Sequence, residues 1–203
     1  ILIIIQRSNG DVFLSSNLIN ALYKSYDSPL IDLLINDDTI SVASLLPHIN
    51  LIHEFSYLKK QTNRWGQEKK LIKNIFKKYD LSINLTASDR SVVYAILASK
   101  ESISAIEEKS QKSWWKKIFL THFYYFDNFK HILKNNLEPL NLLKINFNHV
   151  HYPIKVSSEA TFNVKKKLEA LNIGNFVIFH PSAQYQYKIF PKYLRDELLS
   201  NLS

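Results

Sequence analysis

Ile1-Leu2-Ile3-Ile4-Ile5-Gln6-Arg7-Ser8-Asn9-Gly10-Asp11 is the most informative segment of this 203-residue chain. Its first five residues are all leucine or isoleucine, and polar residues follow at once. A short continuous apolar run that ends in polar residues is typical of a strand buried on both faces, as in a parallel sheet. The segment therefore predicts a buried parallel strand over residues 1–5 with a polar loop at its carboxyl end.

Predicted helices and strands alternate after this strand. Apolar side chains recur at helical spacing in several segments, and the predicted helices cover 12–26, 38–46, 61–78 and 88–98. The predicted strands between them cover 30–35, 50–55, 81–85 and 101–106. Strands that alternate with helices at this spacing indicate βαβ units, so we expect an α/β protein with a doubly wound parallel sheet.

The second half of the chain is less regular. Residues 107–127 show no clear periodicity, a helix is expected over 128–143, and residues 144–156 are interpreted as a linker. A helix over 157–171, a buried strand over 176–179 and a helix over 191–199 follow. Because one strand is not a sheet, this part is interpreted as the beginning of a second α/β domain.

Composition excludes several kinds of site. The chain has only three glycines and no cysteine. A glycine-rich dinucleotide fingerprint, a Walker A loop, a disulfide and a cysteine-ligated zinc site are therefore excluded. A bound phosphate must be held by side chains and helix N-termini. His149 and His151 are spaced as metal ligands but lack an evident third ligand, so we expect no metal.

The net charge is +8 and the sequence pI is about 9.4. A basic surface favours nucleic acid, anionic lipid or phosphorylated substrates, although solubility alone also explains it. No segment reaches the ~18 to 20 apolar residues of a membrane span. We expect a cytoplasmic protein that can rest on a membrane surface.

Asp11 is the leading catalytic candidate. It lies in the turn after the first predicted strand, where ligands bind in open α/β sheets. A carboxylate there can act as a general base. Its other interpretation is an ordinary helix cap.

Three further groups are candidates for binding. His180-Pro181-Ser182-Ala183 with Lys188 follows a predicted strand and suits a diphosphate, or is an incidental loop. A basic cluster can hold acceptor phosphates or form a solvated helix face, and it consists of Lys59, Lys60, Arg64, Lys69 and Lys70 with Trp65. Trp114, Trp115 and the aromatic residues of 119–126 either meet a membrane interface or fill the core, and we favour the core for the tyrosine and phenylalanine residues of 119–126.

Four segments give the chain a family resemblance. They are residues 1–12, Ile31-Asp32-Leu33-Leu34-Ile35, Tyr79-Asp80-Leu81-Ser82-Ile83-Asn84-Leu85-Thr86, and His180-Pro181-Ser182-Ala183 with Lys188 and Pro191. In these segments the chain resembles the ADP-heptose:lipopolysaccharide heptosyltransferases of glycosyltransferase family 9. Asn84-Leu85-Thr86 and Leu137-Glu138-Pro139-Leu140 are most similar to the heptosyltransferase III branch.

The resemblance implies a GT-B architecture, in which two Rossmann-like domains enclose the active site. Residues 1–150 would form the N-terminal acceptor-binding domain. Residues 151–203 would form a linker helix and the incomplete first part of the nucleotide-sugar-binding domain. The family's Asp-Thr-Gly donor motif is absent from the chain.

The resemblance also implies an inverting, metal-independent transfer of heptose from ADP-heptose to the inner core of lipopolysaccharide. Asp11 would be the general base. The implied donor-binding residues are Ser182, Ala183 and Lys188, and the implied acceptor-binding residues are Arg7, Asn9, Lys59, Lys60 and Arg64. No cofactor is expected. The protein would work at the cytoplasmic face of the inner membrane, with peripheral contact to anionic lipid and no nucleic acid.

Two other functions remain open from the sequence. The chain is also consistent with a glycosyltransferase that uses another sugar nucleotide. A non-catalytic basic module that binds anionic lipid or nucleic acid is the other alternative, because lysines and aromatic residues are mixed around Trp114. The polar loops that end the predicted buried strands suit a small-ligand cleft better than this alternative.

Overall fold

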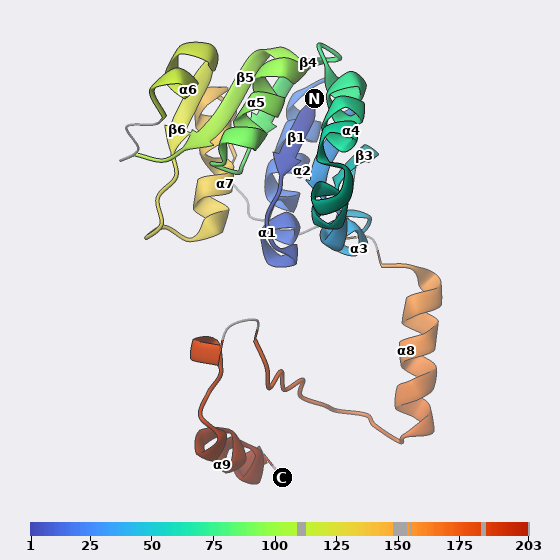
Figure 1. Cartoon of the computed structure of the whole chain (residues 1–203). Coiled ribbons are helices and arrows are strands. Elements are labelled where there is room, and N and C mark those ends of the chain that lie inside the picture. Colours follow the sequence, from blue (N-terminus) through green and yellow to red (C-terminus); the bar gives the residue numbers. More distant parts are fainter. Residues whose placement is uncertain (109–112, 148–153, 155, 184–185, 203) are drawn as a thin grey trace. The chain divides into compact units, whose positions relative to one another are not determined.

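The computed structural model describes residues 1–108, 113–147, 154, 156–183 and 186–202 (Figure 1). The chain divides into two compact units, Ile1–Val156 and Ser157–Ser203. The boundary predicted between residues 150 and 151 lies outside the described residues and stays a prediction. Within the described ranges, no helix is long and apolar enough to cross a membrane.

The first unit is built on one parallel sheet of six strands. In chain order the strands are β1 (Leu2–Ile5), β2 (Ile31–Asn36), β3 (Ile49–Phe55), β4 (Tyr79–Asn84), β5 (Ser99–Ile106) and β6 (His122–Tyr125). Their order across the sheet is β3-β2-β1-β4-β5-β6, and every pair is parallel. This is the strand order of a Rossmann-like, doubly wound fold, which confirms the predicted fold class.

Helices cover both faces of the sheet, which makes a three-layer α/β/α sandwich (Figure 1). One face carries α1 (Asn9–Leu14), α2 (Ser16–Ser25), α3 (Ile40–Ala43) and α7 (Ile132–Leu142). The other face carries α4 (Tyr57–Ile75), α5 (Asp89–Ala98) and α6 (Trp114–Phe119). A 3-10 turn, η1 (Asp37–Thr39), joins β2 to α3.

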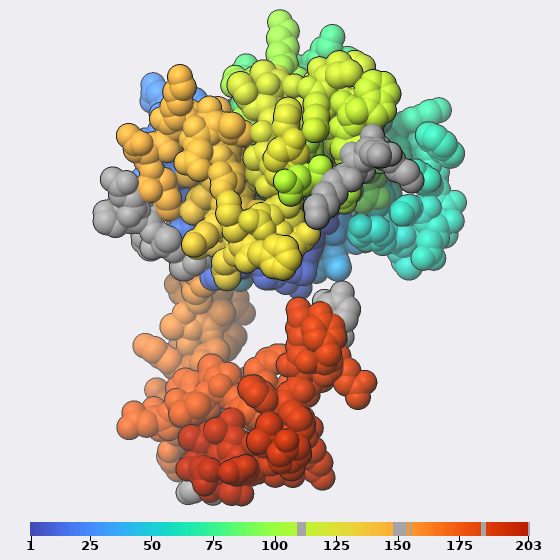
Figure 2. Space-filling view, turned by 90° about the vertical axis from the view of Figure 1, so that its left-hand side faces the viewer, coloured from blue at the N-terminus to red at the C-terminus, as the bar shows by residue number. Residues whose placement is uncertain are grey.

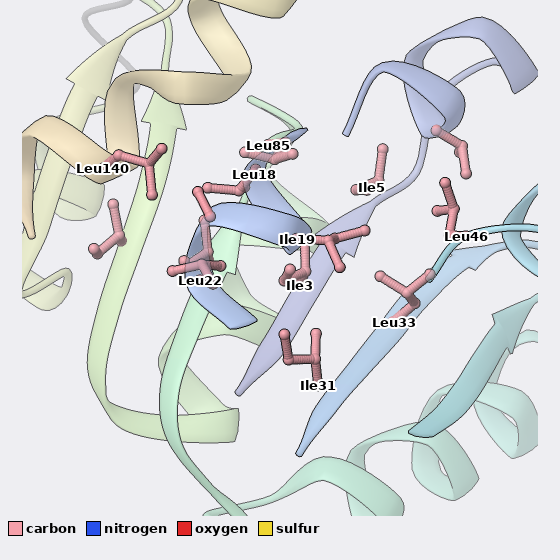
Figure 3. Close-up of a cluster of buried hydrophobic side chains, with 14 of the residues drawn as sticks. Ile3, Ile5, Leu18, Ile19, Leu22, Ile31, Leu33, Leu46, Leu85 and Leu140 are labelled. Atoms are coloured by element: carbon pink, nitrogen blue, oxygen red, sulfur yellow. The ribbon is translucent and has the colours of Figure 1, made fainter. Parts of the chain in front are cut away.

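The side chains of β1 fill the core on both faces of the sheet, as its apolar run predicts. Ile3 and Ile5 pack among α1, α2 and α7, whereas Leu2 and Ile4 pack under α4 and α5. All four are fully buried. Figure 3 shows the first of these clusters, where Leu18 of α2 lies close to the central strands.

The helix predicted over 12–26 is wrong in its bounds, because the structure divides this segment. Helix α1 already begins at Asn9, and α2 begins at Ser16. Between them the Ser15 hydroxyl donates to the carbonyl of Val12 over 2.6 Å. A serine that bonds its own backbone competes with a continuous helix, which explains the break.

The segment interpreted as irregular, 107–127, contains α6 and β6. Strand β6 is only four residues long, so no periodicity marks it in the sequence. It forms because β5 presents a free edge, where Ile103 pairs with His122 and Ile106 with Tyr125.

The second unit contains α8 (Ser158–Ala170), the 3-10 turn η3 (Gln186–Lys188) and α9 (Lys192–Leu202). The strand predicted over 176–179 is wrong: these residues form no strand, and Val177 and Ile178 are exposed. A strand needs a neighbour for its backbone hydrogen bonds. The described residues of this unit supply none.

Candidate functional site

The loop after β1 lies at the point where the order of the strands reverses. β1 pairs with β2 on one side and with β4 on the other. In doubly wound sheets, ligands bind at the carboxyl edge near this point. The loop carries Asp11 into the first turn of α1, where free backbone amides favour a negative charge.

The Asp11 carboxylate has two neighbours on the same loop. Its Oδ2 atom accepts a hydrogen bond from Arg7 Nε at 3.1 Å and another from Ser8 Oγ at 3.0 Å. Its Oδ1 atom has no hydrogen bond to the described residues. The Asp11 side chain is 19% exposed. The carboxylate is thus oriented through one oxygen while the other is available to a ligand.

Arg7 connects this carboxylate to an open pocket. Its guanidinium carbon lies 4.7 Å from the centre of the Phe126 ring, close enough for a cation–π contact. Arg7 also lines a pocket of about 980 Å³ at the carboxyl edge of the sheet. The other lining residues are Ala87, Glu107, Glu108, Tyr125, Phe126, Asp127, Asn128, Phe129 and Lys130. Space for a small polar ligand therefore lies beside the Arg7–Asp11 pair.

The loop between β4 and α5 borders the same edge and is firmly held. The Gln6 amide donates to the Thr86 hydroxyl at 3.0 Å, which ties the loop after β4 to the loop after β1. The Asn84 side chain donates to the Thr86 carbonyl at 2.7 Å and accepts from the Thr86 amide at 3.0 Å. These bonds fix the two loops against each other.

Lys116 is a residue of this region that the sequence did not single out. Its ammonium donates to the Ala87 carbonyl at 3.0 Å and lies 2.7 Å from Asp89. Within Trp114-Trp115-Lys116-Lys117 it reads as one of several surface lysines, and no local signal marks it as buried. Its role depends on a loop almost thirty residues earlier in the chain.

The aromatic residues of 119–126 divide between core and surface. Tyr124 is buried, and burial raises the pKa of its hydroxyl, so it stays protonated at neutral pH. Phe126 packs against the main core cluster. Phe119 and Tyr125 are exposed. The expectation that this run fills the core is therefore correct for only part of it.

The acceptor-side candidates occupy two places. Arg7 lines the pocket described above, and Asn9 is exposed at the start of α1. Lys59, Lys60 and Arg64 lie exposed on α4, away from the lining of that pocket. Lys59 lines a different pocket, of about 860 Å³, between β3 and α4.

The donor-side candidates lie in the second unit, Ser157–Ser203. Ser182 and Ala183 are exposed in an irregular segment, and Lys188 ends η3. The Lys188 ammonium lies 5.7 Å from the centre of the Tyr187 ring.

The described part of the chain contains no group of three or more acidic or histidine side chains placed to hold a metal ion. His149 and His151 lie outside the described residues. Asp11, Glu107 and Asp127 do not form such a group. What the arrangement offers chemically is a carboxylate, an arginine and a polar pocket.

Sequence comparison finds heptosyltransferases. The chain is 28% identical over 194 residues to "Lipopolysaccharide heptosyltransferase 3" of Escherichia coli K12, and 27% identical over 192 residues to a second E. coli protein of that name. Each match covers 90% of this chain and 54% of the relative. The chain thus spans about half the length of these relatives. No family profile matches it.

Solved structures of glycosyltransferases share the fold. A glycosyl transferase family 9 protein of Veillonella parvula has a TM-score of 0.78 at 16% identity, over 99% of this chain and 58% of that chain. E. coli heptosyltransferase WaaC with ADP-2-deoxy-2-fluoro heptose has a TM-score of 0.72 at 13% identity, over 99% and 64%. The resemblance predicted from the sequence is confirmed by both comparisons.

Proposed function

We propose, from the similarity of this chain to glycosyltransferase family 9 heptosyltransferases over nearly its whole length, that it is part of an inverting glycosyltransferase. The enzyme transfers heptose from ADP-heptose to the inner core of lipopolysaccharide and needs no metal. The first unit binds the acceptor. The observation that supports this most directly is the Asp11 carboxylate, which accepts a hydrogen bond from Arg7, a residue that lines the polar pocket at the carboxyl edge of the sheet.

In the proposed reaction, Asp11 Oδ1 accepts the proton of an acceptor hydroxyl. The hydroxyl oxygen attacks the anomeric carbon of the donor, and the bond from that carbon to the diphosphate breaks with inversion. ADP departs with the bonding electrons. Arg7 holds Asp11 Oδ2 in place, so the free oxygen stays directed at the substrate.

The remaining sequence candidates receive roles in the same proposal. Ser182, Ala183 and Lys188 face the diphosphate, and the lysine offsets the negative charge that grows there. Asn9 binds acceptor hydroxyls. Lys59, Lys60 and Arg64 bind anionic groups of the lipopolysaccharide core. The enzyme works at the cytoplasmic face of the inner membrane.

The test is heptose transfer to truncated lipopolysaccharide by the full-length protein that carries this sequence. Loss of a general base typically lowers the rate by about 10²- to 10⁴-fold, and Asp11→Ala is expected to fall in this range. Asp38→Ala is the matched control, because Asp38 is exposed at the same edge of the sheet after β2. Equal rates for wild type and Asp11→Ala would contradict the proposed role.

Two rival functions are decided by binding measurements. Tighter calorimetric binding of another sugar nucleotide than of ADP-heptose would assign a different donor. Salt-sensitive binding of oligonucleotides, without affinity for any sugar nucleotide, would favour the non-catalytic basic module. The polar pocket beside Arg7 favours a small ligand over a nucleic acid or a lipid surface.

A further inference from the structure

Helix α4, turquoise in Figure 2, exposes Tyr57 and two larger apolar areas, Leu58 and Trp65, within a dense group of cations. Leu58 is 76% exposed and Trp65 is 74% exposed. The helix carries six basic residues and one acidic residue; the basic ones are Lys59, Lys60, Arg64, Lys69, Lys70 and Lys73. We call residues 57–70, the part that holds Leu58 and Trp65, the basic arm.

The core needs only the other side of α4. Leu71 and Ile75 are buried in the cluster beneath the helix. The Tyr94 hydroxyl of α5 donates a hydrogen bond to Glu68, the acidic residue of α4, and this bond joins α4 to α5. Leu58 and Trp65 contribute to neither contact. Their exposure therefore has no explanation in the packing of this unit.

The backbone of the basic arm breaks between these two residues. Asn63 has non-helical angles, with φ −146° and ψ 61°, and its side chain accepts a hydrogen bond from the Gly66 amide at 3.1 Å. Asn63 thus caps a second helical segment that begins at Arg64. A Cβ atom at Gly66 would lie 2.5 Å from the Asn63 side chain, so a larger residue there would make that side chain shift. The arm is consequently a short turn of helix followed by a capped helix.

Cations and apolar groups are close neighbours along the arm. The Arg64 guanidinium carbon lies 5.8 Å from the centre of the Trp65 ring, and Lys69 lies one turn further on the same face. The Lys60 ammonium lies 5.6 Å from the centre of the Tyr57 ring. Tryptophan with an aliphatic residue, surrounded by lysine and arginine, is the composition of elements that lie in the interface of an anionic bilayer.

Helix α6 offers an informative contrast. It also exposes a tryptophan, Trp114, together with Ile118 and Phe119. Lys116 of this helix is buried, however, and is paired with Asp89. The exposed lysine of α6, Lys117, donates to the Tyr125 hydroxyl at 3.0 Å, whereas the basic arm carries five cations. Helix α6 therefore attracts anionic lipid headgroups less strongly. The membrane interface that the sequence suggested at Trp114 therefore suits the basic arm better.

We propose that the basic arm docks on an anionic phospholipid bilayer, with Leu58 and Trp65 inserted at the headgroup level. Lys59, Lys60 and Arg64 contact the lipid phosphates of a plain bilayer, and they exchange these phosphates for the anionic core groups of a glycolipid acceptor where the membrane holds one. This deepens the proposed function, since it brings the acceptor-binding unit to the membrane that holds a glycolipid acceptor. Docking itself requires neither donor nor acceptor. It can therefore be measured with plain phospholipid.

The first experiment is co-sedimentation of the chain with vesicles of 70% phosphatidylcholine and 30% phosphatidylglycerol, compared with phosphatidylcholine alone. We expect binding only to the anionic vesicles. A basic residue at such a surface contributes ~1 kcal/mol, or about fivefold, so K59Q/K60Q/R64Q should bind about 100-fold more weakly. K165Q/K166Q/K167Q in α8 removes the same charge elsewhere and should bind almost as wild type.

The apolar contribution has its own matched pair of variants. L58S/W65S should bind at least about tenfold more weakly. At ~25 cal/mol/Å², burying only about 60 Å² of apolar surface in the bilayer accounts for a tenfold difference in binding. I118S/W114S removes an exposed pair from α6 and should change binding little. Equal loss of vesicle binding in L58S/W65S and I118S/W114S would overturn the proposal. Equal loss in the two triple charge variants would overturn it as well.

Fluorescence locates the contact directly. The chain has three tryptophans, so W114F/W115F leaves Trp65 as the only one. Its emission should shift to the blue on anionic vesicles and should be quenched by brominated lipid. Sedimentation of this variant without a spectral shift would overturn the docking at Trp65. Binding of an oligonucleotide in place of vesicles would do the same.

Failure of docking and failure of the proposed function can be told apart. If heptose transfer is absent but the vesicle results hold, only the proposed enzyme function fails. If wild type and L58S/W65S transfer heptose equally to a water-soluble acceptor fragment but neither binds vesicles, only the docking fails.

Discussion

The ammonium of Lys116 lies 2.7 Å from the Asp89 carboxylate, yet the lysine side chain is only 2% exposed while that of the aspartate is 70% exposed. Loss of the ion pair therefore affects the two residues differently. Asp89 and the Ala87 carbonyl compensate the burial of the Lys116 ammonium, whereas Asp89 remains hydrated without Lys116.

We therefore expect Asp89→Ala to lower the free energy of unfolding by about 2 kcal/mol, because it leaves an ammonium buried with a single carbonyl partner. Lys116→Met should cost less, about 1 kcal/mol, because it removes the buried charge itself. Urea denaturation of both variants measures the difference, with the exposed Lys117→Met as control. A larger loss for Lys116→Met than for Asp89→Ala would contradict the argument.

Arg7 is expected to support catalysis by orienting Asp11. Its Nε atom holds Asp11 Oδ2, and its guanidinium packs on the Phe126 ring. Arg7→Ala should lower kcat/KM for heptose transfer by about 10- to 100-fold, because a misplaced base loses the near-attack geometry. Arg7→Lys should restore little, since lysine lacks the planar fork. Full activity in Arg7→Ala would show that Asp11 does not need Arg7.

Asn84 is expected to be the residue that holds the loop after β4. It is fully buried, and its side chain bonds both the amide and the carbonyl of Thr86, as well as the Ser104 hydroxyl at 2.8 Å. Asn84→Leu should cost about 2 to 3 kcal/mol, because the Thr86 amide loses its acceptor, and the Thr86 carbonyl and the Ser104 hydroxyl each lose one of their partners in the interior.

The control for Asn84 is Ser82→Ala on the same strand. Ser82 Oγ donates to the carbonyl of Ala95. Ala95 lies in α5, and its backbone stays within that helix when the serine is replaced. We expect a loss of about 1 kcal/mol there. Thermal and urea unfolding of the two variants should separate them, and equal losses would contradict a special role for the Thr86 bonds.

His53 is expected to make the fold less stable in mild acid. Its Nε2 lies 2.7 Å from the Tyr79 hydroxyl, which itself donates to Asp32 at 2.6 Å. Burial lowers the pKa of His53, and Lys78 lowers it further, while Asp32 acts in the opposite direction. The unfolded chain therefore takes up a proton near pH 6.5 that the folded chain resists.

The resulting stability is fully present above about pH 6.5 and is lost as the pH falls below that value. The urea midpoint should decrease between pH 7.5 and 5, and His53→Gln should weaken this decrease while keeping a donor for Tyr79. His122→Gln replaces an exposed histidine and should leave the decrease unchanged. An identical pH profile in wild type and His53→Gln would contradict the assignment.

Local sequence patterns were sufficient for the first five strands and most helices of the first unit. Residues 1–5 are apolar at every position, and a strand is the element that buries both of its faces in a three-layer fold. The same reasoning placed Asp11 at the carboxyl edge, because the polar end of a parallel strand lies there in doubly wound folds.

Other features depend on residues far apart in the chain. Residues 176–179 are as apolar as a buried strand, yet no described neighbour pairs with them. Four residues over 122–125 carry little signal and nevertheless form β6, since β5 supplies the partner. The two segments show that hydrogen-bond partners, and not apolar character alone, create a strand.

The α/β class, the family resemblance and the carboxylate at the end of the first strand follow from the residues alone, because each depends on positions close together in the chain. The folded structure was needed to establish that Lys116 is buried, that Arg7 both bonds Asp11 and lines a pocket, and that Trp65 is exposed. Exposure and charge pairing are set by which distant elements pack together, and no local pattern contains that information.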